Sequence, residues 1–202
     1  MARYTGPKHR LARQEGINIL EKASASLSRR LTVPPGVHGP KGSHGKKSEY
    51  SLQLREKQKA KRIYGLLEKQ FRKYYEMAAR VKGKTGEALL QMLERRLDNA
   101  VYRLGLVPSR SMARQLVSHG HVLVNGTKVN IPSYILKINE IVSLSGKAMA
   151  MPAVKKLLEG EEAKVVDYFE KKAAAGRLVR VPTREDIPTE VNEQLIIEYY
   201  SR

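Results

Sequence analysis

The sequence predicts an α+β protein, and three observations lead to that prediction. Apolar residues recur at three- and four-residue spacing in several stretches between residues 49 and 118, as in amphipathic helices. Asn-Gly at 125–126 stands between two short apolar-rich segments, which is the strongest local signal for a β-hairpin. Residues 1–47 are basic and interrupted by proline and glycine, so we expect an extended arm there.

The basic arm opens the chain and carries few apolar groups to bury. A short helix fits residues 9–20, whereas the proline- and glycine-rich residues 34–42 fit no regular element. We expect the arm to need a partner to become ordered, and disorder of the isolated chain stays open as the alternative.

A strongly cationic helix is predicted over residues 49–64, with Ser48 as its N-cap. Successive residues of a helix are about 100° apart, so its cations lie on nearly every side, and between Arg55 and Arg62 only Glu56 offsets them. The like charges repel one another and destabilise the isolated helix, and a polyanion lying along the helix would relieve that repulsion. The alternative is a helix whose cations are simply solvated. The five cations are Arg55, Lys57, Lys59, Lys61 and Arg62.

An amphipathic helix is predicted next, over residues 66–81. Its cations lie off the apolar face, Tyr75 is open between core and surface, and the glycines at 83 and 86 end it. The expected core residues are Leu67, Phe71, Tyr74, Ala78 and Val81, and the cations are Lys69, Arg72, Lys73 and Arg80.

Two further helical patterns each end at a glycine. The first covers residues 85–104 and the second covers residues 109–119, with Ser109 as its N-cap. On the second, Arg110 and Arg114 share the side opposite the apolar face. That side could contact nucleic acid or simply be solvated, and the segment alone leaves both open.

The hairpin is predicted over residues 122–129, with a type I′ turn because both central residues need positive φ. The elements expected after it are strands at 134–138 and 140–145, a helix at 152–158, a strand at 178–181 and a terminal helix at 191–200 capped by Asn192.

The net charge of +18 points to a polyanionic partner. Residues 1–82 hold 20 Lys and Arg against 6 Asp and Glu, whereas residues 156–202 hold 8 against 10, so the binding surface should lie in the first two thirds. A membrane partner is disfavoured because the basic segments lack large apolar faces and the chain has no Trp. With no cysteine, no secretory signal and no 20-residue apolar run, we expect a cytoplasmic protein.

Catalytic and metal-binding patterns are missing from the sequence. The five histidines form neither HxxxH nor HExxH, and the sequence Gly83-Lys84-Thr85 lacks the first glycine of a phosphate loop. Glu94 and Asp98 lie four apart, and an ion pair of Asp98 with Arg95 is the simpler explanation. We therefore expect no enzyme, no cofactor, no metal and no small-molecule substrate.

Three motifs resemble the RNA-binding module named after small-subunit ribosomal protein four. They are Arg95-Arg96-Leu97-Asp98-Asn99, then Ser109 to Val117 as SRSMARQLV, and Gly120 to Gly126 as GHVLVNG. That module also occurs in pseudouridine synthases and some tRNA synthetases. The remaining motifs resemble the bacterial ribosomal family itself over nearly the full length: MARYTGP at 1–7, PGVHG at 35–39, LREKQK at 54–59, RIYG at 62–65 and VNEQLIIEYYS at 191–201.

The resemblance implies a mainly helical first domain, residues 48–92, completed by the tail at about 183–202. It also implies a second domain, residues 93–182, in which a small antiparallel sheet packs against helices; the RNA-binding module occupies about 95–160. Some relatives hold zinc through four cysteines. The matching positions here are His9, Ala12, Ser26 and Leu31, so the resemblance implies a zinc-free form.

For function, the resemblance implies a structural constituent of the small ribosomal subunit that binds 16S rRNA first and nucleates assembly at a helix junction in the 5′ domain. Its partners would include small-subunit protein five and messenger RNA at the entry channel, with a part in translational accuracy. The channel residues would be Lys41, Lys46 and Lys47.

The RNA-contact candidates are the cations of the arm and helices, with two histidines at a helix–hairpin corner. They are Arg3, Lys8, Arg10, Arg13, Arg55, Lys57, Lys59, Lys61, Arg62, Arg72, Arg95, Arg96, Arg110, Arg114, His119, His121 and Lys128. Two alternatives stay open: an RNA-modifying enzyme that uses the module as an accessory domain, and a translational repressor that binds messenger RNA.

Overall fold

The computed structural model describes residues 4–20, 24–37, 39, 46, 48–159 and 165–201. The chain divides into two compact units. Residues 1–86 together with 190–202 form the first unit, and residues 87–189 form the second. The architecture is α+β, as predicted, because helices dominate the described part of the first unit and an antiparallel sheet is central to the second.

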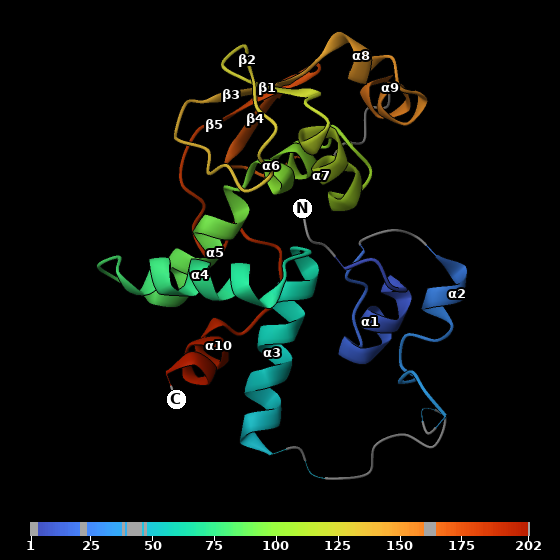
Figure 1. Cartoon of the computed structure of the whole chain (residues 1–202), viewed down its shortest axis with the longest axis vertical. Coiled ribbons are helices and arrows are strands. Elements are labelled where there is room, and N and C mark those ends of the chain that lie inside the picture. The colour runs from blue at the N-terminus through green and yellow to red at the C-terminus, as the bar shows by residue number, and fades with distance from the viewer. Residues whose placement is uncertain are drawn as a thin grey trace. The chain divides into compact units, whose positions relative to one another are not determined.

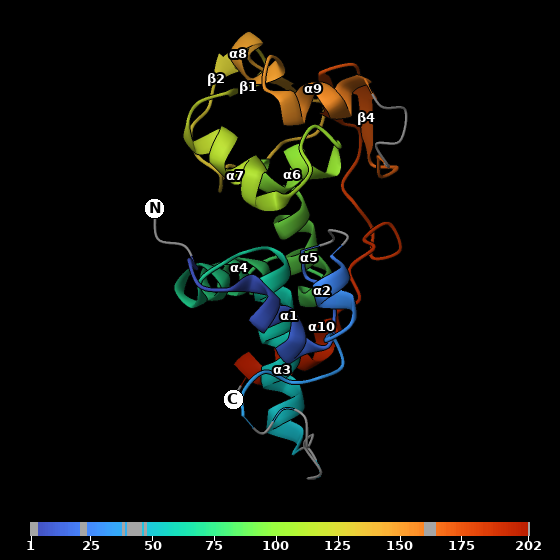
Figure 2. The same ribbon diagram turned by 90° about the vertical axis from the view of Figure 1, so that its right-hand side faces the viewer.

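The first unit joins the two ends of the sequence. Its C-terminal helix α10 packs along α3, and the two views in Figures 1 and 2 both place them side by side. The helices of this unit are α1 (Lys8–Glu15), α2 (Ala25–Ser28), α3 (Glu49–Ile63), α4 (Glu68–Ala79) and α10 (Glu193–Tyr200), and α5 (Thr85–Glu94) contains the boundary between the units.

Local capping explains where two of these helices begin. The Ser48 hydroxyl accepts a hydrogen bond from the Ser51 amide at the start of α3. The Asn192 side chain accepts one from the Gln194 amide at the start of α10. Both satisfy amides that have no partner within the helix, so the caps predicted at these two residues are confirmed.

The arm is more structured than predicted. The short helix predicted at 9–20 is present as α1, whereas α2 forms where an extended segment was expected, and Ala12 and Leu27 are buried. Gly16 ends α1 in the left-handed conformation, with φ of 69°, so the helix predicted to reach residue 20 is shorter. The prediction of an extended arm is therefore not confirmed for these residues.

The core face predicted for α4 is correct in the middle of the helix, whereas Leu67 at its start is only half-buried and Val81 after its end is not in the core. Phe71, Tyr74 and Ala78 are buried, whereas Val81 is 47% exposed. The reason is that α4 ends at Ala79, so helical spacing no longer places Val81 on the buried face. Tyr75 packs against Tyr200 of α10, with ring centroids 4.6 Å apart, which makes it a packing residue.

The second unit is built on a five-stranded antiparallel sheet in the order β2-β1-β3-β5-β4. Residues of α6, α7 and the strands form one apolar core, and Figures 1 and 2 show both helices beside the sheet. The elements are α6 (Leu97–Arg103), α7 (Arg110–Ser118), β1 (Val122–Val124), β2 (Thr127–Lys128), β3 (Ile141–Leu144), α8 (Gly146–Met149), α9 (Pro152–Glu159), β4 (Phe169–Lys172) and β5 (Ala175–Leu178).

The predicted hairpin is confirmed at its turn. Asn125 and Gly126 have φ of 49° and 80°, and Val124 pairs with Thr127 across the turn. The Asn125 side chain also accepts a hydrogen bond of 2.9 Å from the Ile141 amide at the start of β3. Asparagine therefore tolerates the positive φ and, in addition, ties the turn to the next strand.

The single helix predicted over residues 85–104 is wrong, because the chain breaks between α5 and α6. At the break, the Leu97 amide donates to the Tyr134 carbonyl at 2.8 Å, and the Leu136 amide donates to the Arg95 carbonyl at 2.9 Å. The Leu97 amide and the Arg95 carbonyl therefore form long-range hydrogen bonds in place of the i to i+4 bonds of a continuous helix. They also leave the strand predicted at 134–138 as an isolated bridge at Ile135.

The end of the second unit was only partly predicted. The helix expected at 152–158 is present as α9, whereas the short α8 was missed. The strand expected at 178–181 is shifted to β5, which pairs with β4 through a turn containing Ala173 at φ of 50°. Alanine gives no turn signal in a sequence, so this hairpin went unrecognised.

Candidate nucleic-acid interface

The cations of α3 have intramolecular partners. The guanidinium of Arg62 pairs with Glu15 of α1. Arg55 Nη1 lies 3.8 Å from the same carboxylate and donates to the Gln14 carbonyl at 3.2 Å. The ammonium of Lys59 lies 3.6 Å from Glu56. Two of these carboxylate contacts come from outside the helix, so the expectation that Glu56 alone offsets the charge is wrong.

Glu68 takes two more of the α3 cations. Lys57 and Lys61 each donate to it at 2.9 Å, and the Tyr200 hydroxyl donates at 2.7 Å. Desolvation raises the pKa of Glu68, but the hydrogen bonds from Lys61, Tyr200 and Lys57 together outweigh it and lower the pKa to about 2. Glu68 is therefore ionised at neutral pH and places one negative charge between Lys57 and Lys61.

Lys57 does not belong to the exposed surface. Its side chain is 4% exposed, and its ammonium lies 4.5 Å from the ring centroid of Tyr199. Residues in α4 and α10 thus hold this lysine from two sides, as an ion pair and as a cation over an aromatic ring. Its prediction as a phosphate contact is corrected to a packing role.

The pKa of Glu15 is shifted in the opposite direction to that of Glu68. Its side chain is buried, and desolvation raises its pKa although Arg62 and Arg55 act in the opposite direction. The pair with Arg62 therefore joins α1 to α3 at a cost in desolvation. The half-buried Arg62 and the exposed Arg55 still reach the surface.

The described cations of the arm differ in solvent exposure and in their hydrogen bonds to the rest of the arm. Arg10 is exposed and Lys8 is half-buried, whereas Arg13 donates to the carbonyls of Val33 and Pro34 at 2.8 and 3.0 Å. Arg13 thereby fastens residues 33–34 of the arm to α1. Among the remaining candidates, Lys46 is exposed, and Arg3, Lys41 and Lys47 lie outside the described residues.

A group of exposed cations on α4 and the loop after it was largely missed. Arg72 was predicted; it is 69% exposed and makes an ion pair of 3.1 Å with the exposed Glu76. The amphipathic spacing had placed most of these cations off the core face, and that signal could have identified them. We call Lys69, Arg72, Lys73, Arg80, Lys82 and Lys84 the α4 cation group, and all six are exposed.

The adjacent Arg95 and Arg96 have separate structural roles. Arg96 is fully buried, and its Nε and Nη2 donate to Asp98 at 3.0 and 2.7 Å. Arg95 is half-buried and donates to the Leu136 carbonyl at 2.9 Å, and desolvation lowers its pKa. The ion pair of Asp98 with Arg95 expected from the sequence is therefore wrong, since Arg96 takes that place.

Arg110 and Arg114 of α7 are both partly covered. Arg114 lies 3.9 Å from Asp98, and its side chain is 13% exposed. Arg110 Nε donates to the Asn99 side chain at 2.8 Å, and its guanidinium lies 4.5 Å from the ring centroid of Tyr102. Neither arginine is a freely solvated surface charge, and Asn99 and Tyr102 were not recognised as their neighbours.

The corner between α7 and the hairpin presents several polar groups. His119 and Lys128 are exposed, and His121 lies with its Nδ1 3.4 Å from the Ser145 hydroxyl. Gly120 has φ of 70°, and a Cβ there would lie 2.0 Å from Lys128 Cε. The positive φ favours glycine at position 120, whereas the exposed Lys128 side chain could move away from an added Cβ. The corner can offer cationic and imidazole donors to phosphates or 2′-hydroxyls.

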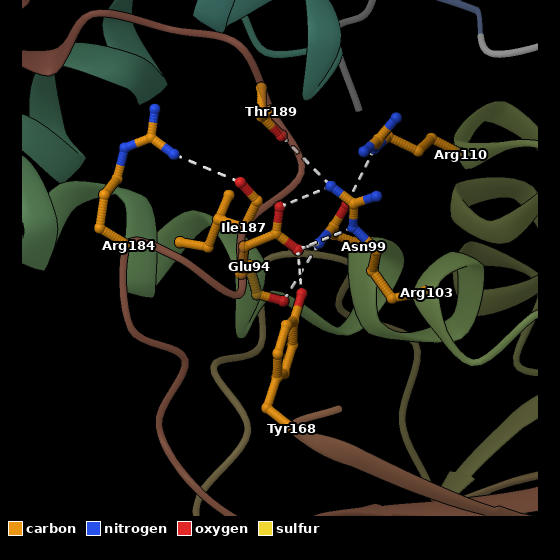
Figure 3. Close-up of polar contacts among 8 residues, drawn as sticks. All are labelled: Glu94, Asn99, Arg103, Arg110, Tyr168, Arg184, Ile187 and Thr189. Atoms are coloured by element: carbon orange, nitrogen blue, oxygen red, sulfur yellow. Dashed lines mark hydrogen bonds and ion pairs between the residues drawn. The ribbon is translucent and has the colours of Figure 1, made fainter. Parts of the chain in front are cut away.

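A buried polar network is centred on Glu94, the last residue of α5, and includes Arg103 of α6. Glu94 is fully buried, and it accepts hydrogen bonds from Arg103 at 2.9 and 3.0 Å and from Tyr168 at 2.8 Å. Arg103 Nη2 also lies 3.2 Å from the Thr189 hydroxyl, as Figure 3 shows. Buried charges need such partners, so this network holds the residues after the sheet against α5 and α6.

In the part of the chain that the structure describes, no cluster of three or more His, Asp or Glu residues could hold a metal ion. Within the same ranges, no helix has the length and apolar character needed to cross a membrane.

Comparison with known proteins identifies the family. Residues 3–94 match the Ribosomal protein S4/S9 N-terminal domain, and residues 95–142 match the S4 domain. The chain is 48% identical to small ribosomal subunit protein uS4A of Symbiobacterium thermophilum, 49% identical to uS4 of Dictyoglomus turgidum and 50% identical to uS4 of Parabacteroides distasonis, each over 100% of both chains. Proteins of this kind are structural constituents of the ribosome and not enzymes. The chain belongs to the uS4 family of small ribosomal subunit proteins.

Proposed function

We propose that this chain is a primary binder of 16S rRNA that nucleates small-subunit assembly at a multi-helix junction in the 5′ domain. The observation that carries the proposal is the similarity over the whole chain to proteins named small ribosomal subunit protein uS4. The S4 domain adds an RNA-binding module at residues 95–142, and ribosomal RNA and other ribosomal proteins are the partners that this family implies.

The physical basis is the presence of exposed cations in each of the two units. Lysine and arginine neutralise phosphates and release counterions, so each contact adds to the salt dependence of binding. A folded RNA junction is recognised mainly through shape, phosphates and 2′-hydroxyls, which suits a broad surface better than a pocket. The α4 cation group and the α7–hairpin corner are exposed and provide such groups.

The proposed contact set follows the sequence candidates, without Lys57 and Arg96 because their side chains are buried. It consists of Arg3, Lys8, Arg10, Arg13, Arg55, Lys59, Lys61, Arg62, Arg72, Arg95, Arg110, Arg114, His119, His121 and Lys128, with the α4 cation group added.

Footprinting on 16S rRNA tests this function. The purified chain is mixed with a 5′-domain transcript, and backbone cleavage is mapped over a range of salt concentrations. We expect protections to converge on one junction and to persist when nonspecific binding has been removed by salt. Protections scattered over the transcript without a common junction would overturn the proposal of a specific primary site.

Further proposals concern the neighbours of this chain in the cytoplasmic ribosome. We place small-subunit protein five beside it, and we assign Lys41, Lys46 and Lys47 to the messenger entry channel with a role in translational accuracy. Crosslinking from positions 41, 46 and 47 in reconstituted subunits should capture messenger RNA. Crosslinks confined to ribosomal RNA would contradict the channel assignment.

A further inference from the structure

We propose that Asn99 is a positioning residue for RNA binding: oriented by the buried Glu94 carboxylate, its side-chain oxygen holds the Arg110 guanidinium in a fixed place for a phosphate. The inference rests on the proposed function, because it assumes that Arg110 contacts RNA. It assigns a role to an amide that carries no charge and is almost entirely buried.

The orientation of the Asn99 amide follows from hydrogen-bond chemistry. Its Nδ2 donates to Glu94 Oε2 at 2.6 Å and to the Glu94 carbonyl at 3.2 Å. An ionised carboxylate and a carbonyl can only accept, so the amide nitrogen must face Glu94. The amide oxygen then faces the other way and accepts from Arg110 Nε at 2.8 Å, as Figure 3 shows.

Glu94 is itself held rigidly. Its carboxylate accepts from Arg103 through Nε and Nη2 and from the Tyr168 hydroxyl, and it has no exposed surface. Asn99 lies on α6, in the interior, and is 2% exposed. The acceptor that Arg110 meets is therefore part of the packed framework and not a flexible surface group.

A second group restricts Arg110 from another direction. The guanidinium carbon lies 4.5 Å from the ring centroid of Tyr102, which is a favourable distance for a cation over an aromatic face. Arginine on a flexible stem loses side-chain entropy when it binds a phosphate. A guanidinium already held at Nε and against a ring loses less, so its phosphate contact is stronger.

The test is a double-mutant cycle in the full-length chain, with affinity for the 16S 5′-domain transcript measured at several salt concentrations. We expect Arg110→Ala to weaken binding about tenfold and to lower the salt slope by about one. Asn99→Ala should weaken binding about threefold when Arg110 is present, and should add nothing to Arg110→Ala, because it acts through that residue.

Tyr134→Phe is the control, because it removes a tyrosine hydrogen bond in the same unit, to Glu140 at 2.8 Å, that involves neither Glu94 nor Asn99 nor Arg110. It should lower the melting temperature and leave the affinity unchanged. Equal losses of affinity in Tyr134→Phe and Asn99→Ala would mean that Asn99 acts only through stability, which overturns the positioning role.

The remaining outcomes separate the two proposals. If Arg110→Ala weakens binding and Asn99→Ala has an equal effect with or without Arg110, the positioning role is overturned and the RNA contact stands. If Arg110→Ala changes neither the affinity nor the salt slope, Arg110 does not contact the RNA. In that case the proposed RNA contact of Arg110 and the proposed positioning role of Asn99 are both overturned. Should Asn99→Ala not fold, Arg110→Lys replaces it, because it keeps the positive charge and removes the Nε donor to Asn99. Affinity equal to that of the native chain would then overturn the positioning role.

Discussion

Helix α3 and the α4 cation group belong to the same unit and are both rich in lysine and arginine, yet their charges have different roles. On α3, carboxylates of Glu15 and Glu68 arrive from other helices and pair with the cations. In the α4 cation group the six side chains are exposed, and the ion pair of Arg72 with Glu76 is itself on the surface. Charge density in the sequence therefore does not identify the surface that is available to RNA.

The strongest test of this comparison is Lys57→Ala. It should lower the free energy of unfolding by about 2 kcal/mol, because a buried ammonium bonded to Glu68 and placed over Tyr199 is removed. Chemical denaturation measures this change. The exposed Lys69→Ala on α4 is the control and should stay within about 0.5 kcal/mol. If the two variants were equally stable, Lys57 would not have the packing role that we assign to it.

The second test turns from stability to RNA affinity. Removing Lys69, Arg72 and Lys73 together should weaken binding to the 5′-domain transcript about tenfold and lower the salt slope by about one for each phosphate that is no longer neutralised. The matched variant replaces three cations of α3 that already have carboxylate partners, Lys59, Lys61 and Arg62, and should change the slope less. A larger slope change in the α3 variant would reverse our assignment of the two surfaces.

The third test uses the pH dependence of the α3 ion pairs. The pKa of Glu68 in the folded chain, about 2, lies below its ordinary value of 4.5, so this carboxylate stabilises the fold fully above about pH 4.5. That contribution is lost as the pH falls from about 4.5 to 2. Glu68→Gln should therefore be less stable than the native chain at pH 7, and the difference should shrink toward pH 2. A difference that is constant with pH would refute this origin.

The smallest effect is expected at the exposed ion pair of α4. Glu76→Gln should change the free energy of unfolding by at most about 0.5 kcal/mol, as for other exposed pairs at i, i+4. At low salt the same variant should bind RNA slightly more tightly, because the negative charge beside Arg72 has been removed. Weaker binding than the native chain would argue that Glu76 orients Arg72 and does not merely compete for it.

Prediction from sequence succeeded where the signal was local. The Asn125-Gly126 turn, the Ser48 cap and the terminal helix capped by Asn192 each depend on a few neighbouring residues, and all three are present. It failed at the break between α5 and α6, since the carbonyls and amides there bond to residues about forty positions away, as in the bond from Leu136 to Arg95. Periodicity over residues 85–104 contains no trace of those partners.

The candidate site also has features that the sequence predicted and features that it did not. The positions of the cations were evident, and so was the α7–hairpin corner with His119 and Lys128. Which cations are free was not evident, because the partner of Arg62 lies 47 residues away at Glu15, and Arg96 is buried against Asp98. Asn99 is neutral and buried, so no rule about basic residues would have selected it.

The sequence by itself determined the local backbone of this protein, its strongly basic character and, through motifs along the whole chain, its family. The tertiary structure decided which charges are neutralised within the fold and which remain at the surface. The physical reason is range: turns and caps depend on residues a few positions apart, whereas an ion pair is settled only when folding brings distant helices together and removes their side chains from water.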